Sequence, residues 1–341
     1  MNLVLRQKRF WLGILVSLVL VVLFFGQTDS AGMLKALASA QYIYLLPALV
    51  LFFCGVFLRA ARWYFLLRTI KPVPLARLFN IVVIGYTAND LLPFRIGELV
   101  RAFLMGQQEG LSKTSTLVTI ALERVFDGLT MLAFIGLAAF FLPLNDYLNA
   151  LLRFGAILFV IVLLALGLVA TQRERIDPLV HRASKRLPDK YGARLLRLFD
   201  SFIHGLSVFH NPLDAVISFL LSVLAWIFEA GMYAVLAAGF GIIQGLKLGA
   251  AASFFVFVLA TAVANLFTIV PSTPGYVGVF DAPVKYVLTL FAVDPNLATS
   301  YTLVLHAALV LPIVILGLFL TARTGLSFGQ LTHQAEAESA T

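Results

Sequence analysis

Long apolar runs separated by short polar segments make up most of the sequence. Several of them reach the roughly 20 residues that an α-helix needs to cross a bilayer. The pattern therefore predicts an all-α, polytopic membrane protein with six to eight transmembrane helices, in one integral-membrane domain over residues 1–323. The apolar runs are Phe10–Phe25, Tyr42–Leu67, Leu117–Leu142, Leu151–Ala170, Leu213–Phe240, Leu246–Val270 and Leu297–Thr321.

The first run has two interpretations. It follows Arg6, Lys8 and Arg9, and small residues stand after it at 28–32, an order of features that a cleaved signal peptide shares. Because the run is long for a signal peptide and later runs are equally apolar, we expect a retained first helix.

The composition agrees with a membrane protein and excludes other classes. The chain is 61% hydrophobic and 12% charged, whereas soluble domains have about 25% charged residues. The net charge of +8 comes from Lys and Arg at the ends of apolar runs, where they set topology and meet anionic head groups, so nucleic acid is not an expected partner. The single cysteine, Cys54, excludes an internal disulfide and a Cys-based metal site.

The distribution of positive charge predicts the orientation. Residues 171–212 contain eight Lys or Arg and four Asp or Glu, whereas the loop Pro143–Asn149 has no Lys or Arg. The positive-inside rule places the first segment in the cytoplasm and the second outside. Counting back puts residues 105–115 in the cytoplasm beside Lys71 and Arg77, so residues 78–104 cross twice or not at all. We expect a multi-pass protein of the cytoplasmic (inner) membrane with both termini in the cytoplasm.

The basic cytoplasmic loop 171–212 contains a helical pattern. Apolar residues recur there every three or four positions, at Leu195, Phe199, Phe202, Leu206 and Phe209, with Ser201 on the opposite face. This spacing predicts an amphipathic helix that either lies in the membrane interface or packs against the bundle. The polar tail 324–341 is expected to be disordered.

The stretch Gly85–Arg101 (GYTANDLLPFRIGELVR) does not fit a plain lipid-spanning helix. It contains the ionisable residues Asp90, Arg95, Glu98 and Arg101, which are costly at membrane depth. Pro93 and Gly97 interrupt a regular helix, and irregular backbone at that depth must be buried or line a cavity. The stretch is either a cytoplasmic loop or a re-entrant hairpin that carries a polar site, and we favour the hairpin.

A second irregular stretch, Asn265–Lys285, has a similar order of residues. Asn265, Pro271, Gly275 and Asp281 follow the same order as Asn89, Pro93, Gly97 and Glu98. Paired Pro/Gly-interrupted segments point to a transporter binding site. Residues 250–291 then form either a second hairpin, which enters from the opposite side, or two ordinary crossings.

Ionisable residues also occur within the spans. Glu123, Arg124 and Asp127 share neighbouring positions on one helix, and Arg59 and Arg62 are three residues apart on another. We expect the acids to pair with Arg59, Arg95 or Arg101, and Glu98 to pair with Arg101. A purely structural ion cluster is the alternative, as are snorkelling anchors for Arg59 and Arg62.

Further ionisable candidates are Glu229, Asp281, Lys285 and His306. Asp281 and Lys285 are four residues apart and would satisfy each other on a helix. His306 lies in an apolar span, where a satisfied packing histidine is commoner than a proton relay. No metal, nucleotide or catalytic-triad motif is present, so we expect no cofactor, no metal and no catalytic residue.

Taken together, these residues resemble the lysylphosphatidylglycerol synthase transmembrane family, also called the flippase-like domain family. The matching segments, in the order of the family, are RWYFLLR (Arg62–Arg68), N-x3-P-x-R-x-GE-x2-R (Asn89–Arg101), ER-x2-D (Glu123–Asp127) and P-x2-PG-x2-G (Pro271–Gly278). One departure is Asp281, where the family often has Glu. The larger members of this family carry a cytosolic aminoacyltransferase domain, for which this chain has no room, so that activity is not expected.

The resemblance implies a flippase or transporter that moves an anionic phospholipid or a polyprenyl-linked lipid across the membrane. Two alternatives stay open: a membrane partner of a separate lipid-modifying synthase, and a head-group transferase. A separate synthase or a second copy of the chain is the expected protein partner. The expected substrate-binding residues are Arg59, Arg62, Asn89, Pro93, Arg95, Gly97, Glu98, Arg101, Glu123, Arg124, Asp127, Asn265, Pro271, Pro274, Gly275, Gly278 and Asp281.

Overall fold

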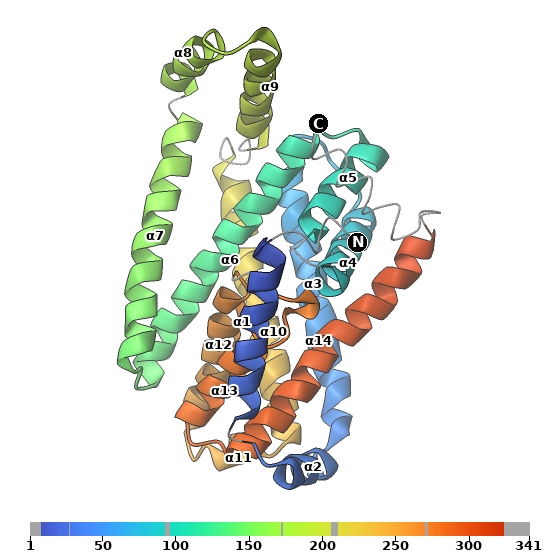
Figure 1. Cartoon of the computed structure of the whole chain (residues 1–341), viewed down its shortest axis with the longest axis vertical. Coiled ribbons are helices and arrows are strands. Elements are labelled where there is room, and N and C mark those ends of the chain that lie inside the picture. Colours follow the sequence, from blue (N-terminus) through green and yellow to red (C-terminus); the bar gives the residue numbers. More distant parts are fainter. Residues whose placement is uncertain are drawn as a thin grey trace.

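The computed structural model describes residues 8–26, 28–92, 96–171, 173–205, 211–269 and 272–323. In these ranges the chain forms helices and no strand, which confirms the all-α prediction (Figure 1). Pro93, Arg95, Pro271 and the predicted tail 324–341 lie outside the described residues. The elements are α1 (Lys8–Phe25), α2 (Ser30–Ser39), η1 (Tyr42–Tyr44), α3 (Leu45–Leu67), α4 (Leu75–Leu91), α5 (Gly97–Glu109), α6 (Lys113–Phe141), α7 (Asp146–Thr171), α8 (Arg173–Ser184), α9 (Asp189–Gly205), α10 (Pro212–Gly239), α11 (Ile242–Gly245), α12 (Ala250–Phe267), η4 (Pro274–Tyr276), α13 (Asp281–Leu290) and α14 (Pro295–Arg323).

Five helical segments in the described part of the chain are long and apolar enough to cross a bilayer, and the bent pair α1–α2 makes a sixth if it counts as one span. This agrees with the lower end of the predicted range. The helix α7 has 26 residues, and at 1.5 Å per residue its length of about 39 Å also exceeds the ~30 Å of a hydrocarbon core. The five segments are Tyr42–Leu67, Lys113–Phe141, Pro212–Gly239, Ala250–Phe267 and Pro295–Arg323.

The helices α4 and α5 form the first predicted hairpin. With 17 and 13 residues, they reach about 25 and 20 Å, less than the ~30 Å of a hydrocarbon core. They pack closely because Gly85 and Gly97 face each other: a β-carbon on Gly97 would overlap the carbonyl oxygen of Gly85. At the turn, the Asn89 side chain accepts a hydrogen bond from the Gly97 N–H at 2.8 Å.

The two ends of this hairpin meet at Glu109. Its carboxylate lies 3.0 Å from Lys71 Nζ and also pairs with Arg77, so the start of α4 and the end of α5 lie at the same end of the bundle. Burial raises the pKa of Glu109, but the hydrogen bonds from Lys71 and Arg77 outweigh it and hold that pKa below its usual value of 4.5. The parity argument from the sequence thus predicted the correct geometry.

The helices α12 and α13 form a second hairpin, which starts and ends at the opposite end of the bundle, near α2 and α11 (Figure 1). Although α12 is long enough to span, α13 has 10 residues, about 15 Å, so the alternative of two full crossings is wrong. The first helix packs over this hairpin: Ser17 Oγ lies 3.1 Å from Thr273 Oγ1, and Lys285 Nζ donates to the Phe24 carbonyl at 2.5 Å.

The tips of the two hairpins meet inside the bundle. The turn that includes η4 packs against α4, and a β-carbon on Gly275 would lie 3.6 Å from the carbonyl oxygen of Asp90. Gly275 has φ +70° and Gly278 has φ +80°, values that glycine adopts without strain. Two irregular segments far apart in the sequence therefore form one region.

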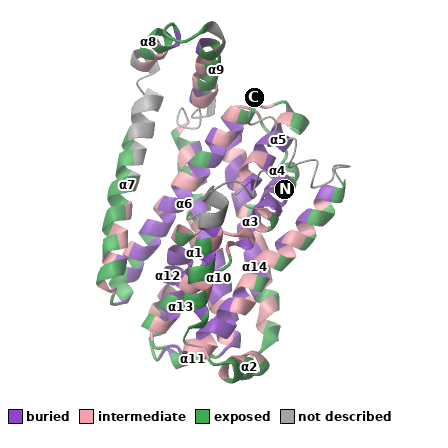
Figure 2. Ribbon diagram, viewed as in Figure 1, coloured by how far each residue is buried: buried purple, intermediate pink, exposed green. Residues whose placement is uncertain are grey.

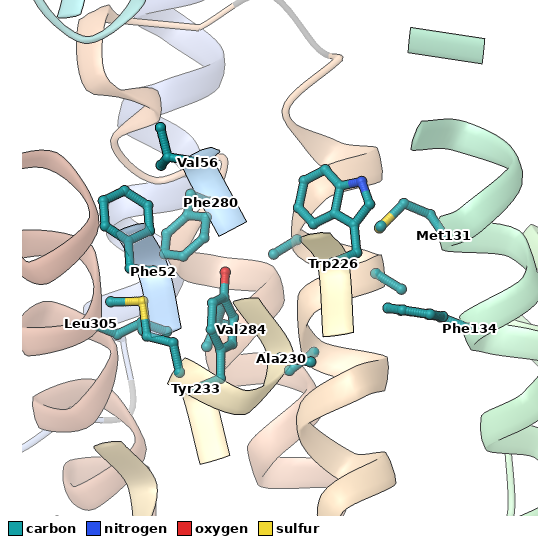
Figure 3. Close-up of a cluster of buried hydrophobic side chains, with 14 of the residues drawn as sticks. Phe52, Val56, Met131, Phe134, Trp226, Ala230, Tyr233, Phe280, Val284 and Leu305 are labelled. Carbon is teal, nitrogen blue, oxygen red and sulfur yellow. The ribbon is translucent and has the colours of Figure 1, made fainter. Parts of the chain in front are cut away.

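The long helices enclose this region with a continuous apolar core (Figure 2). Figure 3 shows Phe52 of α3 beside Phe280 and Leu305, with Tyr233 of α10 next to them. On the other side, Trp226 of α10 faces Met131 and Phe134 of α6. The core therefore holds α3, α6, α10, α13 and α14 together around the hairpin tips.

The basic segment forms two helices, α8 and α9, rather than one. The helix α9 packs against α6, with Ile203 buried and the Ser115 hydroxyl donating to the Ser201 carbonyl at 3.1 Å. Packing against the bundle is thus the alternative that the structure supports, and Ser201, assigned to the outer face from its spacing, contacts α6. Leu206 and Phe209 lie outside the described residues.

Candidate functional site

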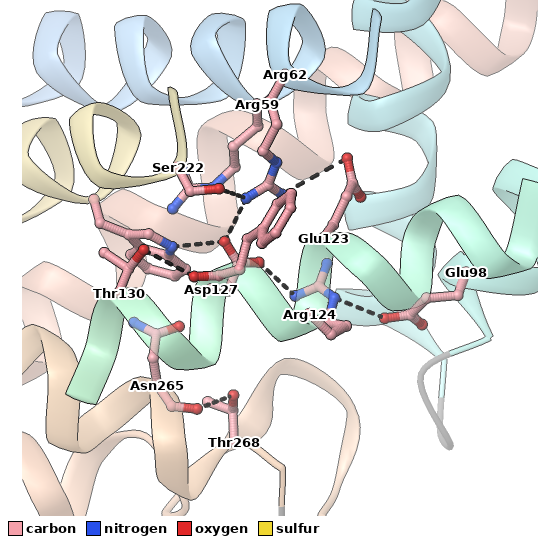
Figure 4. A network of polar contacts seen from close by, with 12 residues as sticks. Arg59, Arg62, Glu98, Glu123, Arg124, Asp127, Thr130, Ser222, Asn265 and Thr268 are labelled. Carbon is pink, nitrogen blue, oxygen red and sulfur yellow. Dashed lines mark hydrogen bonds and ion pairs between the residues drawn. The ribbon is translucent and has the colours of Figure 1, made fainter. Parts of the chain in front are cut away.

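A buried network of charged side chains joins α3, α5, α6 and α10 (Figure 4). Its centre is Arg62, which is fully buried. The guanidinium donates to Asp127 Oδ1 at 2.5 Å and to Ser222 Oγ at 2.8 Å, and it lies 3.6 Å from Glu123. Burial of an unpaired charge is very costly, so the carboxylates of α6 are required to keep this arginine in the core.

Arg101 of α5 contacts Glu123 as well, at 2.8 Å, and its guanidinium stacks 4.0 Å from the centre of the Trp63 ring. The predicted pair of Glu98 with Arg101 is therefore wrong. Glu98 instead lies 3.9 Å from Arg124. The reason is that Arg101 points between α3 and α6, where a second helix brings a carboxylate closer than its own helix does.

The network extends to a second arginine on α3. Arg59 contacts Glu229 at 2.6 Å and stacks 4.2 Å from the Trp226 ring centre. The same indole donates to Asp127 at 2.8 Å. Arg59 and Arg62 have exposed fractions of 5% and 0%, so the interpretation as snorkelling anchors is wrong for both.

A cavity of about 170 Å³ lies beside this network, where the hairpin tips meet. Its wall has both apolar and charged residues, contributed by α3, α4, α6, α10, α12 and α14 and by the turn that includes η4, called the second turn below. Ligand sites of drug size occupy about 300–1,000 Å³, so the cavity fits a head group rather than a whole lipid. The lining residues that carry its polar chemistry are Arg59, Tyr86, Asn89, Asp90, Arg124, Glu229, Asn265, Thr268 and His306.

The cavity separates the predicted site residues into two groups. Arg59, Asn89, Arg124, Asn265 and Gly275 line it. The other described ones are not among its lining residues: Arg62, Gly97, Glu98, Arg101, Glu123, Asp127, Pro274, Gly278 and Asp281.

Two of the arginines predicted to bind the substrate do not line the cavity. The guanidinium groups of Arg62 and Arg101 are buried against carboxylates, so in this conformation they do not face the cavity. Asn265 lines the cavity, but its amide donates to the Thr261 carbonyl of its own helix at 3.0 Å. Among the described residues, no contact of Asn265 corresponds to the hydrogen bond between Asn89 and the Gly97 N–H.

The predicted site did not include the two acids and the histidine of the lining, Asp90, Glu229 and His306. Glu229 and His306 were visible as charged or titratable residues inside apolar runs, and Asp90 as an acid in the first irregular stretch. The sequence does not show that these residues lie close together. They come from α10, α14 and α4, and the packing of the hairpin tips brings them to one cavity.

Asp281 and Lys285 do not satisfy each other. Asp281 Oδ1 lies 2.7 Å from His306 Nδ1, and Asp281 Oδ2 accepts from the Gly278 N–H at 2.8 Å. Lys285 instead contacts the Phe24 carbonyl and Thr28 of the first helical segment. Both side chains find partners on other elements, which a spacing of four residues could not reveal.

Among the ion contacts, those of Arg124 are the loosest. It lies 3.6 Å from Asp127 and 3.9 Å from Glu98, and its Nε has no hydrogen-bond partner among the described residues. This arginine also lines the cavity. Its guanidinium is therefore the cation best placed to accept an anionic ligand. No group of His, Cys, Asp or Glu in the described ranges could hold a metal ion.

Comparison with known proteins places this geometry in a family. The model of the lysylphosphatidylglycerol synthase TM region matches residues 10–317. The chain belongs to this family. The match includes both hairpins and the charged helices between them, which confirms the resemblance drawn from the motifs.

Relatives named UPF0104 membrane proteins are similar to the chain over most of their length. A UPF0104 membrane protein of Methanothermobacter thermautotrophicus is 28% identical over 305 residues, 85% of this chain and 87% of the relative. A UPF0104 membrane protein of Methanocaldococcus jannaschii is 22% identical over 307 residues, 85% of this chain and 87% of the relative. No solved structure matches the chain. The family and the apolar helices together establish a multi-pass membrane protein.

Proposed function

We propose that this protein is a lipid flippase or transporter of the cytoplasmic membrane, with both termini in the cytoplasm, which moves an anionic phospholipid or lipid-linked substrate. The observation that carries the proposal is the polar cavity between the tips of two hairpins that enter the bundle from opposite ends. Binding sites of transporters form where interrupted helices meet near the middle of the membrane.

The proposed binding mode follows from the size and charge of the cavity. A lipid phosphate would contact Arg124 and Arg59, the two arginines among the described lining residues. Glu229 and Asp127 orient them through the contacts described above. Because about 170 Å³ holds a head group only, the acyl chains would stay in the bilayer, where they need no polar partner.

The buried arginines have a supporting role in this proposal. Arg62 and Arg101 fix α3 and α5 to α6 through short ion pairs. They thereby hold the lining helices in place without contacting the lipid.

The test is lipid translocation by the purified protein in liposomes, with fluorescent phosphatidylglycerol as the probe and phosphatidylcholine for comparison. Arg124→Gln removes the loosely held cation while keeping most of its volume. We expect it to slow translocation of the anionic probe by at least about tenfold, the effect of losing roughly 1.4 kcal/mol from a charged hydrogen bond. Arg77→Gln is the matched control, because Arg77 is half-exposed at the hairpin base and Glu109 keeps Lys71.

Each result has a distinct meaning if all variants unfold at the same temperature. Equal translocation rates for Arg124→Gln and wild type would show that the head group binds elsewhere than at Arg124 in this cavity. Translocation that requires an added synthase would favour the partner function, which the name of the family also suggests. A new lipid species in the mass spectrum would favour a transferase, and a wild type that moves no probe at all would contradict the flippase function.

A further inference from the structure

His306 of α14 lies between a carboxylate and a carbonyl oxygen. Its Nδ1 is 2.7 Å from Asp281 Oδ1, and its Nε2 is 2.7 Å from the Gly275 carbonyl oxygen. Its ring also lies edge-on to Phe280, with ring centres 5.1 Å apart. The side chains of His306 and Asp281 have exposed fractions of 16% and 5%, and His306 faces the cavity.

This arrangement determines how many protons the pair holds. A carbonyl oxygen only accepts hydrogen bonds, so Nε2 must carry a proton. The 2.7 Å contact between Nδ1 and Oδ1 also needs a proton between the two atoms, because otherwise an imidazole lone pair would face a carboxylate lone pair. In this conformation His306 and Asp281 therefore share one proton more than a neutral imidazole beside a carboxylate.

The groups around the pair come from every side of the cavity. The carboxyl of Asp90 interacts electrostatically with His306. Lys285 points away, toward Phe24 and Thr28. Among the described residues, the remaining titratable ones that line the cavity are Arg59 on α3, Tyr86 on α4, Arg124 on α6, Glu229 on α10 and Tyr276 in the turn that includes η4.

The shared proton also connects two parts of the fold. Asp281 holds the second turn through the Gly278 N–H, and His306 holds it through the Gly275 carbonyl. This turn packs against the tip of the first hairpin at Asp90. Removal of the proton places two lone pairs opposite each other and weakens the attachment of the turn to α14.

We propose that the His306–Asp281 pair is the proton-binding site through which a pH gradient drives lipid movement. Neutral His306 and ionised Asp281 take one proton from water in the cavity, so the charge of the pair changes from −1 to zero and the turn closes on α14. Return of that proton to water restores the charge and releases the turn. This inference rests on the proposed function, whose substrate site is Arg59 and Arg124.

The protonation step can be measured without any lipid. The protein has five histidines, so ¹⁵N-histidine labelling gives few signals, and the His306→Gln spectrum identifies the one that belongs to His306. We expect the His306 ring nitrogens to titrate within the pH range over which the protein stays folded, and Asp281→Asn to move that titration to lower pH. A His306 signal that stays unchanged over this range would overturn the proposal.

Coupling is measured in liposomes with and without a pH gradient, with fluorescent phosphatidylglycerol as the probe. One proton per lipid allows a leaflet ratio of up to about tenfold for each pH unit. We expect the wild type to concentrate the probe in one leaflet when a pH gradient is present. In His306→Gln the ratio of the probe between the leaflets should be the same with and without the gradient. The matched control is His181→Gln, since His181 contacts Asp177 on the exposed helix α8 and should respond like wild type.

The outcomes separate this inference from the proposed function. If the wild type moves the probe but its leaflet ratio does not change with the pH gradient, the coupling is overturned while the flippase function is retained. A His306→Gln variant that builds the full ratio would do the same. No translocation of any probe would contradict the flippase function, and with it the coupling.

Discussion

Glu123→Gln tests whether the ion network holds the helix bundle together. Glu123 contacts two arginines, Arg101 at 2.8 Å and Arg62 at 3.6 Å. The substitution keeps the shape of the side chain but removes its charge. Arg62 then keeps its ion pair with Asp127, whereas Arg101 loses its ion pair with Glu123. The Nε and Nη2 of Arg101 already lack hydrogen-bond partners among the described residues.

The expected loss of stability follows from burial and distance. At 2.8 Å and an effective dielectric constant of about 20, the Coulomb attraction is about 6 kcal/mol. Desolvation of the glutamate, which the substitution relieves, offsets part of it. Breaking a buried pair by removing one partner typically costs about 3–5 kcal/mol, and we expect Glu123→Gln to lie in that range because both side chains are 2% exposed.

The assay is the free energy of unfolding in detergent micelles, with Glu109→Gln as the matched control. The partners of Glu109 are 44% and 47% exposed, so that variant should cost no more than about 1 kcal/mol. Replacing both Arg101 and Glu123 by Met should recover most of the loss, because it leaves no unpaired buried charge. A Glu123→Gln loss no larger than that of Glu109→Gln would refute the reasoning.

Two further outcomes test the first hairpin. Gly97→Ala should lower the free energy of unfolding by about 1–3 kcal/mol, because the added methyl group meets the Gly85 backbone. The control is Gly245→Ala, whose methyl group meets open space and should leave stability nearly unchanged. Equal losses in the two variants would contradict the close packing. Because the pKa of Glu109 is lowered from 4.5, its pairing stabilises the fold above about pH 4.5 and that stability is lost as the pH falls through the lowered pKa. As the pH is lowered from 7, the unfolding temperature of Glu109→Gln should therefore fall less steeply than that of the wild type. An equally steep fall in both proteins would refute this.

The hairpin geometry was predictable because it follows from local rules. An excess of Lys and Arg marks one side of the membrane, and an apolar segment too short to cross must return. Those two facts placed residues 78–104 correctly. Similarly, the cost of intramembrane charge identified Glu123, Asp127 and the arginines as members of an interior network, and the structure shows them buried together.

The pairing inside the network was not predictable from spacing. Glu98 and Arg101 are three residues apart, yet Arg101 contacts Glu123, which is 22 residues away. Residues three or four apart on a helix can meet, but a facing helix can bring a partner closer. His306 illustrates the same limit, because its partners are Asp281 at the start of α13 and Gly275 in the turn before it, whose positions depend on the packing of α13 and α14.

The lengths of the ion contacts indicate which wall of the cavity is fixed. Arg62 and Arg59 contact their carboxylates at 2.5 and 2.6 Å, and both arginines belong to α3, which packs extensively against α10. Arg124, in contrast, has contacts of 3.6 and 3.9 Å, and charge attraction at those distances leaves the guanidinium free to exchange one anionic neighbour for another. In the proposed binding mode, a phosphate would therefore draw Arg124 from weak contacts without breaking the short pairs that hold the helices. His306 and the turn that it contacts also line the cavity, so the adjustable parts of the lining are Arg124 on α6 and this turn, while the short ion pair between Arg59 of α3 and Glu229 of α10 stays in place.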